Sequence, residues 1–176
     1  MLHAGRCVAI PALLMAAATP VPAASRTIAD QASELTYDLC PLFLNDELSL
    51  TGRELKERGF GSKVEGVFNK RFGEIRMVTA KLPDGNVSFG GTSQTLCQVI
   101  VEGSNAEMIV ARVKQDMRLL NVNWQLDPAN SGKRGTATVE TYRAPPESGA
   151  VLHLQLAAVS LGERPTAIVQ LFALEE

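Results

Sequence analysis

Apolar residues near the start of the chain recur with a helical period. They are spaced three or four positions apart, which places them on one face of an amphipathic helix: Ile28, Ala32, Leu35, Leu39 and Leu42. Pro41 should kink or stop this helix near Cys40, because proline removes a backbone donor. A second short helix is expected from Thr51 to Arg58, closed by Gly59.

From residue 75 onward the pattern changes to the alternation typical of strands. Six strands are expected, at residues 75–80, 87–89, 96–101, 136–142, 151–161 and 166–174. We expect Gly90-Gly91 to break the second of them. Between the third and fourth, Ser104 and Glu107 form a capping box that opens a helix extending to Leu120.

This order of elements is helices, strands, one helix and strands again, without a regular strand–helix alternation. It predicts an α+β fold with a single domain, in which a largely antiparallel sheet carries helices packed mainly on one face.

The last two strands alternate only weakly, because both faces of each are mostly apolar. Leu152, Leu154 and Leu156 share one face, which we expect to be core. The opposite face is predicted to be a possible interaction surface, for a partner or for a homodimer, and its named members are Val151, His153, Val159 and Leu161.

Composition narrows the class of protein. The chain has 176 residues, 20% of them charged and 45% hydrophobic, with a formal net charge of −2. This is typical of a globular domain and disfavours a nucleic-acid-binding surface, which would be basic. No apolar run reaches the roughly 20 residues of a membrane span.

The N-terminus predicts a signal peptide at residues 1–23. Arg6 precedes an apolar run from Cys7 to Ala18, and small residues and prolines follow it. Cleavage after Ala23 would leave a single domain at residues 24–176 and a periplasmic or secreted location.

Removal of that leader would leave two cysteines, Cys40 and Cys97. An even pair in an exported chain indicates one disulfide, although two independent buried thiols are the alternative. A metal site is not expected, because the spacing is wrong and His153 is the one histidine outside the leader.

The sequence predicts no catalytic residue and no cofactor. Gly59-Phe60-Gly61 lacks the third glycine of a dinucleotide loop, and no Gly-x-Ser-x-Gly motif occurs. His153 lies within a predicted strand, where a strand histidine without a catalytic role is the simpler interpretation. The nearest paired carboxylates, Asp46-Glu47 and Glu54 with Glu57, lie in polar stretches.

One segment is locally basic. Residues 53–76 contain seven basic and four acidic residues, with Phe60, Phe68 and Phe72 interleaved. Such a segment could contact an anionic surface such as lipid headgroups or polysaccharide, or it could be an ordinary surface with its phenylalanines in the core.

Several of these motifs together resemble a known pattern. Cys40-Pro41, Gly59-Phe60 and Cys97-Gln98-Val99-Ile100-Val101, followed by a helix to Leu120, are similar to a family of small exported alphaproteobacterial proteins of unknown function. The resemblance covers roughly residues 28–124. It implies an exported protein with a Cys40–Cys97 link and carries no activity with it.

The function expected from the sequence is therefore a non-enzymatic binding or interaction module of the cell envelope, with a protein or an envelope component as its partner. Two alternatives stay open, a carrier of a small apolar ligand and a small carboxylate-based hydrolase. A carrier would show a large apolar cavity, and a hydrolase would show polar groups converging in a cleft.

Overall fold

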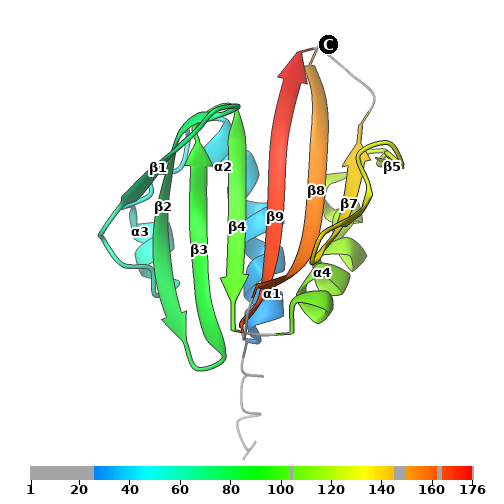
Figure 1. Ribbon diagram of the computed structural model, residues 1–176. Helices are drawn as coiled ribbons and strands as arrows, with labels where there is room; N and C mark the ends of the chain where they lie inside the picture. The colour runs from blue at the N-terminus through cyan, green and yellow to red at the C-terminus, as the bar shows by residue number, and fades with distance from the viewer. Residues whose placement is uncertain (1–25, 104, 145–149, 162–163, 176) are drawn as a thin grey trace, which may run out of the picture.

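A computed structural model describes residues 26–103, 105–144, 150–161 and 164–175. Its centre is a nine-stranded antiparallel sheet with the order β1-β2-β3-β4-β9-β8-β7-β5, and β6 pairs with β7. The helices lie behind the sheet in the view of Figure 1, so one face is covered and the other is open. The predicted α+β class and the single antiparallel sheet are confirmed. The predicted signal peptide lies outside the described residues.

The N-terminal helix is longer and less regular than predicted. It runs through α1 (Ile28–Glu34), a π-helical turn (Leu35–Leu39) and α2 (Cys40–Leu44). Pro41 was expected to kink or stop the helix near Cys40, and the stop is not found, because the helix continues into α2. Pro41 occupies the first turn of α2, where its missing N–H costs little, and the π turn just before it absorbs the local irregularity.

The predicted short helix is confirmed as a single turn, α3 (Arg53–Lys56). The first four strands of the sheet follow it along the chain. These strands are β1 (Glu65–Asn69), β2 (Gly73–Leu82), β3 (Gly85–Thr92) and β4 (Leu96–Glu102). Strand β1 and the early start of β2 had not been predicted, because glycines interrupt the pattern there.

The expectation that Gly90-Gly91 would break a strand is also wrong, because β3 continues through both glycines. Their φ angles are 153° and 147°, which other residues rarely adopt. A Cβ at Gly90 would lie 2.0 Å from the carbonyl oxygen of Arg76, so only glycine fits this close approach of two strands.

A crossover helix links the two halves of the sheet. Helix α4 (Ala106–Gln115) continues into a 3-10 turn at Met117–Leu120. The helix is capped by Asn105, whose side chain accepts from the Met108 N–H. The predicted cap, Ser104, lies outside the described residues. After α4 come β5 (Gln125–Leu126), β6 (Gly132–Arg134), β7 (Ala137–Arg143), β8 (Ala150–Leu161) and β9 (Arg164–Glu175).

The main core lies between the covered face of the sheet and the helices. Strands β4, β8 and β9 contribute Val99, Leu154, Leu156 and Val169, all buried, and helices contribute Leu35 and Ile109. The space between sheet and helices is thus filled by side chains of the described residues. No helix among them is long and apolar enough to cross a membrane.

Candidate functional site

The open face of the sheet offers the broadest surface that the helices leave uncovered (Figure 1). Because successive side chains of a strand point to opposite faces, register alone decides which residues meet there. In β8 the odd-numbered residues face outward, since Leu154 and Leu156 belong to the main core on the covered side.

Two adjacent rows of this face form a strip without charge. The rows cross β2, β3, β4, β9, β8 and β7, and each residue is the direct cross-strand partner of the next. We define the neutral strip as the first row, Thr79, Ser88, Ile100, Ile168, Ala157 and Val139, together with the second row, Met77, Gly90, Gln98, Gln170, Gln155 and Thr141. None of the twelve is charged, although a fifth of the chain is.

Three carboxamides lie side by side within the neutral strip. Gln98 pairs in register with Gln170, and Gln170 pairs with Gln155. The Gln155 amide donates to Thr141 Oγ1 at 3.0 Å. Gln98 is only 8% exposed, and Gln155 and Gln170 are partly buried. Each glutamine carries both donor and acceptor atoms, so the exposed part of this row can bind a partner of either kind.

The neutral strip is bounded on two sides. Beside Gln98, the buried residues Leu96, Ile75 and Phe172 form a second small core on the open face, and Phe72 packs against it. The Arg71 guanidinium lies over Phe172, 5.3 Å from the ring centroid. At β7, the Thr141 hydroxyl donates to the carbonyl oxygen of Asn130 at 2.9 Å, so the loop before β6 closes that end.

The structure places three of the four predicted surface residues, Val151, His153 and Val159, on this open face or at its margin. His153 is partly buried and stacks on the Phe172 ring, with centroids 5.1 Å apart. Val159 is partly buried beside the first row of the neutral strip, while Val151 is only 3% exposed. The side chain of Leu161 lies outside the described residues. The prediction that this group forms an interaction surface stays a prediction.

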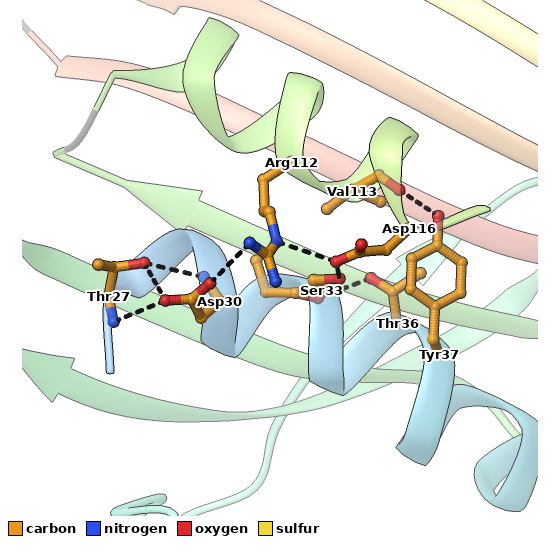
Figure 2. Close-up of polar contacts among 9 residues, drawn as sticks. Thr27, Asp30, Ser33, Thr36, Tyr37, Arg112, Val113 and Asp116 are labelled. Carbon is orange, nitrogen blue, oxygen red and sulfur yellow. Dashed lines mark hydrogen bonds and ion pairs between the residues drawn. The ribbon is translucent and has the colours of Figure 1, made fainter. Parts of the chain in front are cut away.

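A second polar cluster joins α1 to α4 (Figure 2). The Asp116 carboxylate accepts from Ser33 Oγ at 2.7 Å and from Arg112 Nε at 2.9 Å. Arg112 also pairs with Asp30 at 3.2 Å, and Asp30 accepts from the Thr27 hydroxyl. The sequence pattern places Asp116 on the polar face of its helix, but in the structure its side chain is buried against α1. The hydrogen bond from Ser33 satisfies the buried carboxylate there.

Each group of this cluster has its partner within the cluster. The hydrogen bond from Thr27, with the backbone of Thr27 and Arg112 adding to it, holds the pKa of Asp30 below its usual value. Burial, with nearby Asp116, raises the pKa of Tyr37, whose hydroxyl donates to the Val113 carbonyl. A cavity of about 310 Å³ lies beside these residues. The arrangement clamps two helices together.

The paired carboxylates singled out by sequence do not converge in the structure. Asp46 and Glu47 lie in an exposed loop, where Asp46 accepts from Ser93 at 2.8 Å. Glu54 is exposed on α3 and Glu57 is exposed just after it, where Glu57 pairs with Arg53 at 3.5 Å. Among the described residues, no group of three histidine, cysteine or acidic side chains could hold a metal ion.

The disulfide predicted between Cys40 and Cys97 is present. It joins α2 to β4, with the two Cα atoms 5.4 Å apart, and both cysteines are buried in the main core. A buried disulfide favours an oxidising compartment, since reducing compartments keep thiols free. The bond also fixes the N-terminal helix to the centre of the sheet.

A third polar contact ties α4 to β7 and gives a pH prediction. Lys114 Nζ binds Glu140 at 2.7 Å, and Tyr142 donates to the same carboxylate. The hydrogen bonds from Lys114 and then Tyr142 lower the pKa of Glu140 below its model-peptide value of 4.5. Its contribution to stability is therefore complete above pH 4.5 and is lost as pH falls through the lowered pKa.

We expect Glu140→Gln to remove this acid-dependent contribution. The variant should lose up to about 1 kcal/mol at neutral pH, because the pair is partly exposed, and progressively less as the pH is lowered below 4.5. Urea unfolding measured across this pH range tests the expectation. An equal loss at both ends of the range would contradict it, and Glu107→Gln on the exposed side of α4 is the matched control.

Comparisons with known proteins supply no relative. No family model, no curated protein and no solved structure matches this chain. The resemblance to exported alphaproteobacterial proteins thus has no support beyond the disulfide that it implied.

Proposed function

We propose that this protein is a non-enzymatic, exported interaction module that docks through the neutral strip. The single observation behind the proposal is the absence of charge over two rows and six strands of an uncovered sheet face. Interfaces are distinguished mainly by depletion of charged residues at their centre and by a polar rim. Here the rim exists too, since Lys81 and Glu102 lie one row beyond the strip on β2 and β4.

The occupant proposed for the strip is a second copy of the same chain. Two sheets can pack face to face, and a two-fold axis brings identical surfaces together. The carboxamides of Gln98, Gln170 and Gln155 suit this arrangement, because an amide can donate to and accept from its own kind. The partly buried Ile100 and Ile168 beside them supply apolar contact.

Export belongs to the same proposal. The buried disulfide supports an oxidising compartment, and the apolar N-terminal run supports a signal peptide. We infer a periplasmic or secreted location, with action at the cell envelope.

Val159→Lys tests the proposal. A lysine beside the strip would place two like charges close to a two-fold interface, so we expect the dimer to weaken at least tenfold while the monomer stays folded. Light scattering over a concentration series and a thermal melt measure the two quantities. Ser160→Lys is the matched control, since Ser160 is exposed and neighbours Val159 on the opposite face of β8.

The result is decisive in either direction. A wild-type protein that stays monomeric up to the highest concentrations reached contradicts self-association. A Val159→Lys protein that does not fold would show that this margin of the open face is core rather than interface. In that case Gln170→Lys, at a partly buried position within the strip, separates folding from association.

A further inference from the structure

The β1–β2 hairpin forms an exposed edge of the sheet. Strand β1 stands at one end of the strand order and pairs only with β2 among the described strands. Its first four residues are exposed on both faces, so neither the helices nor the second small core covers them. In Figure 1 the hairpin lies at the edge of the sheet farthest from β5.

Two adjacent large apolar side chains of this strand face solvent. Phe68 is 77% exposed and Val67 is 63% exposed. Because neighbouring residues of a strand point to opposite sides, the strand presents an apolar group on each side. The other interleaved phenylalanines behave differently, since Phe60 is buried in the main core and Phe72 is partly buried.

Cations outnumber acidic residues in the segment around this pair of side chains, although Glu74 is the direct cross-strand partner of Phe68. Residues 63–76 carry four basic residues and two acidic ones, whereas the chain as a whole is acidic. Lys70 and Arg71, at the turn after β1, are exposed, and Arg76 is exposed on β2. Of the two acids, Glu65 is neutralised by Lys63 at 2.7 Å, and this contact lowers the pKa of Glu65.

We propose that the β1–β2 hairpin binds the anionic surface of a lipid bilayer edge-on, with Phe68 and Val67 entering the interface from the two sides of β1 and Lys70 and Arg71 lying at the headgroups. Peripheral membrane proteins bind such surfaces through exposed apolar side chains that are flanked by cations. A soluble polyanion would use the cations but would leave Phe68 in water. This surface adjoins the neutral strip, with which it shares β2, but the proposal does not depend on self-association through the strip.

A second copy of the chain fits the same edge poorly. If two β1 strands paired about Val67, the continuing register would bring Lys63 of one chain opposite Arg71 of the other, and like charges across strands repel. A strand of five residues also buries little area compared with a stable interface.

Co-sedimentation of the purified full chain with vesicles tests the proposal. We expect binding to vesicles of equal parts phosphatidylglycerol and phosphatidylcholine, little binding to phosphatidylcholine alone, and weakening by salt. Phe68→Ser should lower the partition coefficient about tenfold or more. Lys70→Gln should lower it about fivefold. Leu119→Ser, at a 61% exposed leucine on a different element, is the matched control and should leave it unchanged.

Four results would overturn the proposal. One is a wild-type protein that does not sediment with the anionic vesicles, and another is equal binding to both vesicle types. A third is a Phe68→Ser variant that binds anionic vesicles and heparin as the wild type does, which would show a purely electrostatic contact. The fourth is a Phe68→Ser substitution that converts a dimer to a monomer in the absence of lipid, which would assign the edge to a second copy. All three variants should keep the wild-type circular dichroism spectrum, because every substituted side chain is exposed.

Discussion

Replacing both Cys40 and Cys97 by alanine should lower the free energy of unfolding by about 4 kcal/mol. The disulfide closes a loop across 57 positions, and a loop of that length loses much conformational entropy in the unfolded chain when it is cross-linked. Because a domain of this size is stabilised by only about 5–15 kcal/mol, the loss is a large fraction of the total.

Urea unfolding of the oxidised protein and the double variant measures this loss. The wild-type protein treated with reductant is the matched control, since it breaks the same bond without changing the side chains. We expect the two perturbed proteins to agree within about 1 kcal/mol. A double variant as stable as the oxidised protein would show that the link between α2 and β4 contributes nothing to the fold.

Asp116→Ala should be the second large effect, with a loss of about 2–3 kcal/mol. The Asp116 side chain is only 11% exposed and accepts from both Ser33 and Arg112. Its removal leaves the buried Ser33 hydroxyl of α1 without an acceptor, and Arg112 of α4 loses one of its two acidic partners. The loss is smaller than for a fully buried ion pair, because Arg112 is 43% exposed and water can solvate it.

A double-mutant cycle isolates this contact. Ser33→Ala, Asp116→Ala and the combined variant should give a coupling energy of about 1 kcal/mol or more between the two side chains. Glu107→Ala, at an exposed position of the same helix, should change stability by less than about 0.5 kcal/mol. Additive losses at positions 33 and 116 would contradict the helix clamp.

The fold class could be predicted because the period of apolar residues changes clearly along the chain. Ile28 to Leu42 follow a helical spacing, and the strands after residue 75 follow an alternating one, so the layers were predictable. The errors fell at glycine and proline. Gly90-Gly91 continue β3 because another strand lies too close for a Cβ, and Pro41 is accommodated after a π turn. Neither feature can be predicted from the neighbouring residues in the sequence.

The neutral strip could not be found from the sequence for a different reason. Gln98, Gln155 and Gln170 each stand as single polar residues within apolar strands, which is a visible signal. Their meeting depends on the register of β4, β9 and β8, and on the crossover that places β9 beside β4. Register depends on pairings distant in sequence, so single strands do not reveal it. Phe68 is exposed whereas Phe60 is buried, and the exposure of Phe68 follows from the position of β1 at the sheet edge, which the local sequence does not reveal.

The central claim is that two copies of the chain meet through the neutral strip. Side-chain amide resonances of ¹⁵N-labelled protein, recorded over a dilution series, test it most directly. The account predicts that the resonances of Gln98, Gln155 and Gln170 shift with protein concentration, while that of Gln94, which is exposed after β3, does not. Resonances of the three glutamines that stay fixed while the protein associates would place the interface elsewhere and contradict the claim.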